Sequence, residues 1–236
     1  MNSKSLENEI KLAFATSDFY QLLSVSMQFP SEKFAEAVRQ GSYWEDAIAI
    51  LEDISCNDED IHLVDTNIKS LRASKETPEL MTELRCEYTR LFNDPKRPQL
   101  AIYESVFSYS PEGNKQKPML FMSPEAMDAE KCYSHAGIKV EKKFGEPADH
   151  MAAELEFMMF LYANKGKALR ENNLTNLEIT NHHIRKFKES HLEKWGYKFF
   201  DCLEEATTLD HYALIARLAK VGLKRVLDLE VAVLSK

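Results

Sequence analysis

Apolar residues recur every three to four positions along most of the chain, the spacing that places side chains on one face of an α-helix. Near the N-terminus this spacing is carried by Leu6, Ile10, Phe14, Phe19, Leu22, Leu23 and Met27. The pattern ends at Phe29-Pro30, after which Ser31 can cap a short second helix that stops at Gly41. These positions predict a long first helix followed by a short one.

Further helices are indicated by the same spacing in Trp44, Ile48 and Leu51, and again in Ile61, Val64, Ile68 and Leu71. Thr77-Pro78 reads as a cap followed by proline at the first helical position, which opens a helix toward Phe92. Ser123-Pro124 starts another helix by the same logic, and we expect it to run to about His135, just before Gly137.

The C-terminal part of the chain carries the strongest helical signal. After Glu146-Pro147 the pattern predicts a helix to about Asn164, followed by Gly166. A polar stretch from Asn172 to Asn181 is expected to separate two final helices, roughly 183–206 and 209–233. The last helix has a broad apolar face made of Tyr212, Ile215, Ala216, Ala219, Leu223, Val226 and Leu227.

The helical pattern is interrupted in the middle of the chain. Residues 93–99, NDPKRPQ, carry two prolines that exclude a regular helix, and residues 109–122 read as an exposed, mobile loop. Seven glycines and eight prolines are too few for a turn-rich β-sandwich or barrel. We therefore predict one all-α domain over residues 1–236, a bundle of about ten helices. Within it, 1–92 and 123–236 can form sub-bundles joined by the 93–122 loop region.

Charge and composition narrow the function. Thirty basic and 38 acidic residues give a net charge of −8, which disfavours nucleic acid and anionic membranes and attracts cationic peptides. The first ten residues, MNSKSLENEI, lack the apolar core of a signal peptide, and no apolar run is long enough to span a bilayer. We expect a cytoplasmic protein without stable membrane insertion.

Catalytic and metal motifs find little support. Cys56, Cys86, Cys132 and Cys202 form no C-x-x-C pair and suit buried thiols in a reducing compartment. Glu59 and His62 form a single E-x-x-H pair, and Glu146, His150 and Glu154 have one His for two carboxylates, so both ligand sets are incomplete. No nucleophile elbow or phosphate loop occurs. The prediction is no catalytic site, no metal and no cofactor, and a metal-dependent hydrolase or an NTPase is the least favoured alternative.

Two segments stand out because each places acidic and aromatic groups beside a helix end, next to a break in the chain. The first is residues 87–107, EYTRLFNDPKRPQLAIYESVF, and the second is residues 146–160, EPADHMAAELEFMMF. Together they resemble the two signatures of the TorD/DmsD family. The C-terminal order of His191-Leu192, Trp195, Phe199-Phe200, His211-Tyr212 and Leu218-Ala219 is similar to that family as well. Departures are Asn93-Asp94-Pro95 for the usual Gly-Pro, Ile102 for a proline, and Phe107 for a tyrosine.

The resemblance implies a TorD-like all-α fold and a chaperone function. Members of that family are cytoplasmic proteins that bind immature molybdopterin-dependent oxidoreductases, often at the twin-arginine signal peptide, and hold back export until the cofactor is inserted. The peptide-binding residues that it implies here are Tyr103, Glu104, Ser105, Asp149 and His150, to which we add Glu154 and Phe157. The supporting residues are Tyr88, Phe92, Phe107, Glu146 and Pro147.

The residue types agree with that role. Guanidinium groups pair with carboxylates such as Glu104, Asp149 and Glu154, and an apolar segment needs aromatic or methionine walls such as Phe157 and Met158. Structural roles are open beside these. Asp149 falls in the first turn of its predicted helix and can satisfy free N–H groups there. His150 can be a hydrogen-bonded histidine tying the motif to the loop near Tyr103, or a group that titrates near neutral pH. Met151, Met158 and Met159 can simply fill the core.

Two questions of partnership stay open at this point. The first expectation is that the chain binds an apo molybdoenzyme through its twin-arginine signal peptide. The alternative is that it binds the body of a non-exported catalytic subunit, as some relatives, the nitrate-reductase chaperones, do. The segment 93–123 also offers a route to a homodimer, because helical proteins with long connections can exchange elements between chains.

Overall fold

Helices account for most of the residues described by the computed structural model, which covers residues 3–71, 76–110, 118–138 and 145–234. The predicted all-α class is confirmed, since the only β-type pairing in those ranges is an isolated bridge between Tyr103 and His150. Within the same ranges, no helix combines the length and the apolar character that crossing a bilayer requires.

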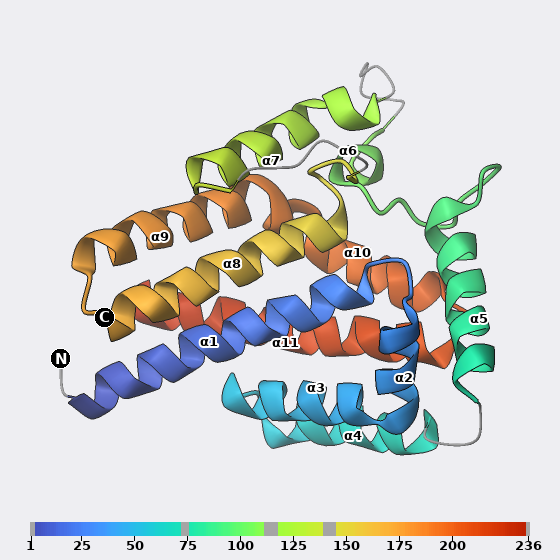
Figure 1. Cartoon of the computed structure of the whole chain (residues 1–236), viewed down its shortest axis with the longest axis horizontal. Helices are drawn as coiled ribbons and strands as arrows, with labels where there is room; N and C mark the ends of the chain where they lie inside the picture. Colours follow the sequence, from blue (N-terminus) through green and yellow to red (C-terminus); the bar gives the residue numbers. More distant parts are fainter. Residues whose placement is uncertain (1–2, 72–75, 111–117, 139–144, 235–236) are drawn as a thin grey trace. The chain divides into compact units, whose positions relative to one another are not determined.

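Figure 1 shows the order of the elements along the chain. The helices are α1 (Ser3–Ser26), α2 (Glu32–Gln40), α3 (Ser42–Asp53), α4 (Asp58–Leu71), α5 (Thr77–Tyr88), α6 (Glu104–Phe107), α7 (Pro124–His135), α8 (Met151–Arg170), α9 (Leu174–Phe187), α10 (Glu193–Ala206) and α11 (Asp210–Leu234). Two π-helical turns, η1 (Thr89–Asn93) and η4 (Lys188–Leu192), and a 3-10 turn, η3 (Leu120–Met122), complete them.

The chain divides into two compact units, each built from separate stretches of sequence. Unit 1 comprises residues 1–24 and 101–199, and unit 2 comprises residues 25–100 and 200–236. This division does not follow the boundaries suggested by the 93–122 loop region. The prediction of one domain with two sub-bundles stays a prediction.

Small residues bring helices of unit 1 close together. Ser17 Oγ donates to the carbonyl of Met159 at 2.9 Å, and Ser24 Oγ donates to that of Ala152 at 2.8 Å, so two hydroxyls hold α1 along α8. At Gly166 a Cβ would meet the ring of Phe14 at 2.9 Å. Helix α8 also packs against α9, which in turn contacts α7 (Figure 1).

Several predicted helix boundaries are confirmed. Ser31 caps α2 by accepting from the Phe34 amide at 3.2 Å, and Gly41 ends that helix at φ +93°. Ser123 caps α7 by accepting from the Ala126 amide at 3.1 Å, and Gly137 follows at φ +87°. In each case a side-chain acceptor or a glycine supplies what the helix end lacks.

Other boundaries are wrong, and the reasons are physical. Helix α8 continues through Gly166 to Arg170, because that glycine makes room for Phe14 rather than ending the helix. The polar stretch 172–181 is largely helical: α9 starts at Leu174, where Asn173 caps it by accepting from the Asn176 amide at 3.0 Å. Thr77 is already helical, and Glu76 holds the cap position of α5.

Three further predictions also need correction, two about side-chain burial and one about a loop. Leu227 is 40% exposed, whereas the other six members of the predicted face of α11 are buried. Cys56 and Cys132 are buried as expected, but Cys86 is exposed and Cys202 is intermediate. Part of the predicted loop 109–122 forms the turn η3, and residues 111–117 lie outside the described residues.

In unit 2, the carboxylate of Glu87 fastens the end of α5 to the turn between α10 and α11. It accepts from the Arg90 guanidinium at 2.7 and 2.8 Å, from the Thr208 amide at 2.6 Å and from the Thr207 hydroxyl at 2.7 Å. Arg90 also donates to the carbonyl of Ala206 at 2.7 Å. Burial alone would raise the pKa of Glu87, but these hydrogen bonds outweigh it and lower the pKa to about 2.

We expect Glu87→Gln to lower the free energy of unfolding at neutral pH by about 2–3 kcal/mol, since a depressed carboxyl pKa is stability that the ionised form supplies. That contribution is present above the unfolded pKa of about 4.5 and is lost as the pH falls toward 2. The decline in stability between pH 7 and pH 4 should therefore be smaller in the variant, by about 1 kcal/mol. Urea unfolding at both pH values measures this, with the exposed Glu205→Gln as control. If the free energy of unfolding depends on pH equally in the wild type and the Glu87 variant, the hydrogen bonds of ionised Glu87 do not stabilise this turn.

Candidate functional site

The two motif segments that the sequence singled out lie side by side in unit 1. The Glu104 amide donates to the carbonyl of Asp149 at 2.9 Å, and the Met151 amide donates to that of Ile102 at 2.9 Å. Between these bonds, Tyr103 pairs with His150, and their rings pack at 5.2 Å between centroids. The tyrosine hydroxyl donates to Glu146 at 2.7 Å. Four backbone or side-chain contacts thus fix one segment against the other.

Asp149 acts on the neighbouring segment rather than on its own helix. Its Oδ2 accepts from the Ser105 amide at 3.0 Å, within the first turn of α6. The predicted place of Asp149 in the first turn of its helix is wrong, because α8 begins only at Met151. Burial raises the pKa of Asp149, and hydrogen bonds from Ser105 oppose that rise.

His150 is the N-cap of α8. Its Nδ1 accepts from the Ala152 amide at 3.1 Å, which requires an unprotonated nitrogen. Burial lowers the pKa of His150 to about 4, against a weaker opposing influence of the Glu146 charge. The hydrogen-bonded structural role is therefore confirmed, and titration of this ring near neutral pH is not supported.

A buried ion pair connects the first motif to the turn η4. His191 Nδ1 lies 2.6 Å from Glu104 Oε2, and each residue is 2% exposed. The other ring nitrogen, Nε2, lies 3.3 Å from Asp128 Oδ2 on α7. Burial by itself would lower the pKa of His191, but hydrogen bonds to Cys132 and Glu104 and the nearby Glu154 raise it to about 10. The stability that this charge supplies is present below the unfolded pKa of about 6.5 and is lost as the pH rises toward 10.

Glu154 is the most enclosed carboxyl of the group. Its Oε2 accepts from the Trp195 indole at 3.0 Å, and the residue has no exposed surface. Burial, followed by the charge of Glu104, raises the pKa of Glu154 well above its usual value, which favours the uncharged acid. Phe107 packs on the same tryptophan, Trp195, with 5.6 Å between the ring centroids.

The three carboxylates proposed for guanidinium binding are thus internal. Glu104, Asp149 and Glu154 are 2%, 0% and 0% exposed, and each already accepts a hydrogen bond within unit 1. In this conformation they hold the motif segments in place. Glu146 and Glu156 are the exposed carboxylates of the second motif, and Tyr103 beside Glu146 is half-buried. The peptide-binding role of the seven predicted residues stays a prediction.

The remaining predicted residues divide between the units. Phe157 and Pro147 are buried in unit 1, where Phe157 packs on Tyr133 and Phe187 at 4.6 and 4.7 Å between centroids. Tyr88 and Phe92 belong to unit 2, where their rings pack at 4.9 Å. Met151 and Met158 are fully buried, as expected of core residues, whereas Met159 is only partly buried.

Sequence reasoning missed Tyr133, which joins α7 to the second motif. Its hydroxyl donates to the carbonyl of Ala148 at 2.6 Å, and burial raises its pKa well above the usual value. The available signal was the apolar face of α7, on which Ala126, Ala129, Cys132 and Tyr133 recur at helical spacing and are buried.

A second missed feature is an exposed apolar surface, which we call the methionine patch. It consists of Met119, Leu120, Phe121, Met122 and Met127, which are 68%, 38%, 66%, 68% and 47% exposed. Turn η3 carries most of the patch and packs on α7, as does α6 of the first motif. Four consecutive apolar residues in an otherwise polar stretch were the signal for it. A cluster of exposed apolar side chains makes this surface a candidate interaction site.

Two groups of donors in the described ranges lie close enough to share a metal ion. One is Asp128, Cys132 and His191, the other is Glu104, Glu154 and His191, and the donor atoms of each lie within 4.8 Å of one another. His191 belongs to both and is engaged in the ion pair with Glu104. Neither group contains the E-x-x-H pair Glu59 and His62, nor His150.

Comparison with known proteins places the chain among a group of relatives. Residues 57–201 match the model of a family described as the nitrate reductase delta subunit. The chain is 22% identical to the chaperone protein TorD of Vibrio parahaemolyticus over 66% of this chain and 67% of that protein. It is 26% identical to the TorD of Vibrio cholerae over 72% and 69% of the two chains.

A solved structure supports the fold. The chain superposes with a TM-score of 0.50 and 20% identity on a protein from Archaeoglobus fulgidus described as a candidate redox enzyme maturation protein. The match covers 88% of this chain and 93% of the other. At this identity the likeness concerns the fold alone.

The ion pair between His191 and Glu104 generates a stability prediction. We expect His191→Gln to lower the free energy of unfolding at neutral pH by about 3–5 kcal/mol, because it removes the cationic partner of the buried Glu104 carboxylate. The double variant His191→Gln/Glu104→Gln should lose less than the sum of the two single variants, since two amides can bond to each other. Urea unfolding tests this, with the exposed His182→Gln as control. Additive losses would mean that the two groups do not act as a pair.

Proposed function

Because the chain belongs to the family described as the nitrate reductase delta subunit, we propose that it works as a cytoplasmic chaperone for an immature molybdopterin-dependent oxidoreductase. The match spans more than half of the chain and contains both motif segments. The recognition of the TorD/DmsD family from these motifs is confirmed by that match together with the two TorD relatives. The named relatives are chaperones, so the role proposed is binding rather than catalysis.

The polar groups of the motifs are engaged in internal hydrogen bonds, and this supports a binding role rather than a catalytic one. Glu104, Asp149 and His150 form hydrogen bonds that join α6, α8 and η4. A catalytic acid or base must reach a substrate, whereas these groups face one another inside unit 1. Their arrangement builds a rigid support, and rigid support is what a recognition surface needs.

The observation that carries the proposal is the methionine patch beside this support. We propose that the client's twin-arginine signal peptide is the segment bound and that its apolar stretch covers Met119, Phe121 and Met122. Flexible methionine side chains adapt to apolar segments of differing sequence. The arginines of such a peptide would find exposed carboxylates in Glu146 and in Asp128, whose side chain is 48% exposed.

An alternative epitope is the body of a non-exported catalytic subunit, as in an assembly chaperone for nitrate reductase. The family description favours it, because the matching family is named for a nitrate reductase subunit. The methionine patch would then cover an apolar surface of the enzyme rather than a peptide.

The patch can be tested with a matched pair of variants. We expect Phe121→Ser/Met122→Ser to weaken the binding of a synthetic twin-arginine signal peptide, measured by calorimetry, about tenfold or more. A tenfold loss corresponds to about 1.4 kcal/mol, and the burial of one such apolar side chain against the peptide contributes a comparable free energy. The control Leu174→Ser/Ile179→Ser removes two other exposed apolar side chains, from α9 of the same unit, and should bind like the wild type.

Undiminished peptide binding by the Phe121/Met122 variant would remove the patch from the peptide site. If the wild type does not bind the peptide but captures the client's catalytic subunit, and the patch variant fails to do so, the enzyme-body alternative is favoured.

A further inference from the structure

His191 has a different neighbour at each of its two ring nitrogens. On one side, Nδ1 lies 2.6 Å from Glu104 Oε2 inside unit 1. On the other side, Nε2 lies 3.3 Å from Asp128 Oδ2, and Cys132 is hydrogen-bonded to the same ring. The ligand atoms of Asp128, Cys132 and His191 all lie within 4.8 Å of one another. A carboxylate, a thiol and an imidazole therefore meet where η4 lies against α7.

Two elements that are distant in the sequence supply these three side chains. Asp128 and Cys132 are four residues apart on α7, a spacing that puts both on one face of the helix. His191 comes from the π-helical turn η4, a kind of turn that is frequent at functional sites. Because the histidine is far from the other two residues along the chain, no local motif could reveal the group.

The chemistry and the spacing of these donors favour zinc. Proteins bind Zn²⁺ through thiolate, imidazole and carboxylate groups, usually in a tetrahedron, and zinc accepts all three kinds of ligand at once. In such a tetrahedron a nitrogen and an oxygen ligand are about 3.4 Å apart. His191 Nε2 and Asp128 Oδ2 are 3.3 Å apart, which is long for a hydrogen bond, so an ion placed between them displaces only a weak contact.

Glu104 supplies the outer partner that a metal-bound histidine needs. A histidine that binds a metal through one ring nitrogen almost always donates its other N–H to a carboxylate, a carbonyl or a water, which fixes the orientation of the ring. The buried contact between His191 Nδ1 and Glu104 is of this kind. The inner group of Glu104, Glu154 and His191 suits zinc less well, because it lacks a thiol and its Glu104 already occupies Nδ1.

Solvent reaches the group from one side. Cys132 and His191 are 4% and 2% exposed, whereas the side chain of Asp128 is 48% exposed. An ion can therefore enter at Asp128, and a water molecule can complete the tetrahedron, as it does in zinc sites with three protein ligands.

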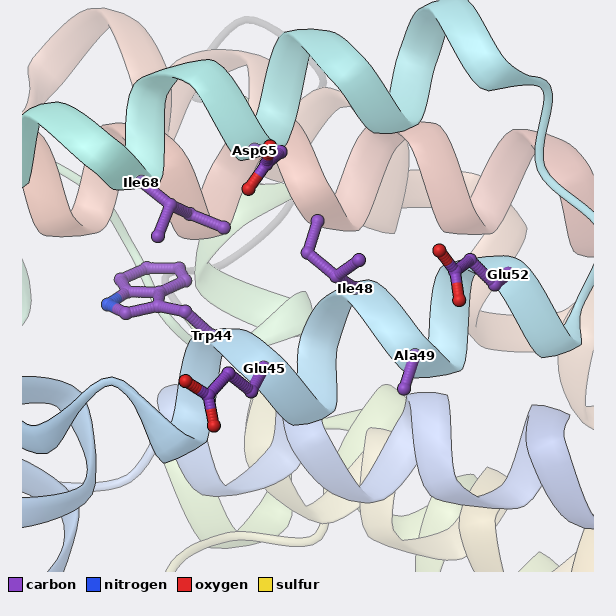
Figure 2. Close-up of a pocket in the computed structure, with 7 residues that line it drawn as sticks. All are labelled: Trp44, Glu45, Ile48, Ala49, Glu52, Asp65 and Ile68. Carbon is purple, nitrogen blue, oxygen red and sulfur yellow. The ribbon is translucent and has the colours of Figure 1, made fainter.

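An acidic cleft in unit 2 shows the contrast. Figure 2 shows Glu45, Glu52 and Asp65 around this cleft, which lies between α3 and α4. The residues that line it include these carboxylates but neither a thiol nor an imidazole. Carboxylates alone suit magnesium or calcium better than zinc, so this cleft serves as a comparison site for zinc binding.

We propose that Asp128, Cys132 and His191 bind one zinc ion. Glu104 orients the histidine and is not itself a ligand. When the ion binds, the thiol and Nε2 release their protons to the solvent, as zinc ligands do. The ion ties η4 to α7, the helix that also carries Met127 of the methionine patch. The inference goes beyond the proposed function, because it assigns metal binding and does not depend on what the patch binds.

Cobalt substitution tests the site in the unaltered chain. The full-length protein is first treated with a chelator and kept reduced. We expect stoichiometric Co²⁺ to produce thiolate-to-metal absorption in the near ultraviolet together with the intense visible bands of a tetrahedral ion, and excess Zn²⁺ to abolish both. With zinc bound, long-range ¹H–¹⁵N NMR should show that His191 keeps the proton on Nδ1 and has lost the one on Nε2.

Matched variants locate the ion. Asp128→Asn and Cys132→Ala should each weaken zinc binding about tenfold or more, measured by competition with a chromophoric chelator, since even the loss of an outer partner costs about 10–100-fold. Cys86→Ala removes an exposed thiol, and Glu52→Gln/Asp65→Asn removes two carboxylates of the comparison cleft. Both controls should bind zinc like the wild type. Circular dichroism confirms that each variant is folded.

Three results would overturn the inference. The first is the lack of thiolate absorption when cobalt is added to the wild type, whether or not zinc binds. The second is an absorption that Cys86→Ala removes and Cys132→Ala does not, which would put the ion on the exposed cysteine. The third is an unchanged zinc affinity in folded Asp128→Asn. The cobalt spectrum of the wild type decides the matter even if a variant does not fold. Weaker peptide binding by the Phe121/Met122 variant, with zinc binding intact, would bear on the proposed function alone.

Discussion

A buried charge must have a partner, and in unit 1 that requirement is met by His191 and Glu104, 2.6 Å apart and each 2% exposed. The pair joins η4 to the first motif segment, and the backbone of that segment is bonded in turn to the second motif segment at Asp149 and Met151. Asp149 and Glu154 extend the network by accepting from the Ser105 amide and the Trp195 indole. Removing any one partner would leave a polar group without compensation in the core. The polar residues of the two motif segments are therefore, first of all, the framework of this unit.

That framework changes where recognition is to be sought. Glu104, Asp149 and Glu154 are buried in this conformation, so the recognition surface that we propose is built from exposed residues beside them. The methionine patch offers apolar area next to α6 and α7, and Glu146 and Asp128 offer exposed charge. This combination suits the chaperone role that we propose.

Local signals predicted much of the fold. Ser31, Gly41 and Ser123 act at helix ends through bonds to their near neighbours, so their effects could be inferred from a few residues. Gly166 and Asn173 could not be understood in this way. The glycine is needed because the ring of Phe14, far away in sequence, packs against it, and the asparagine starts a helix where polarity suggested a loop. In the candidate site, the sequence brought Tyr103 and His150 together correctly. The burial of Glu104 and Glu154 was not predictable from the motifs alone, because their partners are His191 of η4 and Trp195 of α10, far away in sequence.

The most direct test of this account is the protonation state of His191, observed by long-range ¹H–¹⁵N NMR of its imidazole nitrogens as a function of pH. A charged ring locked between Glu104 and Asp128 predicts that both nitrogens stay protonated through neutral pH and that the proton is lost only near pH 10. A titration midpoint near 6.5, the value of an unperturbed histidine, would contradict the buried ion pair on which the framework depends.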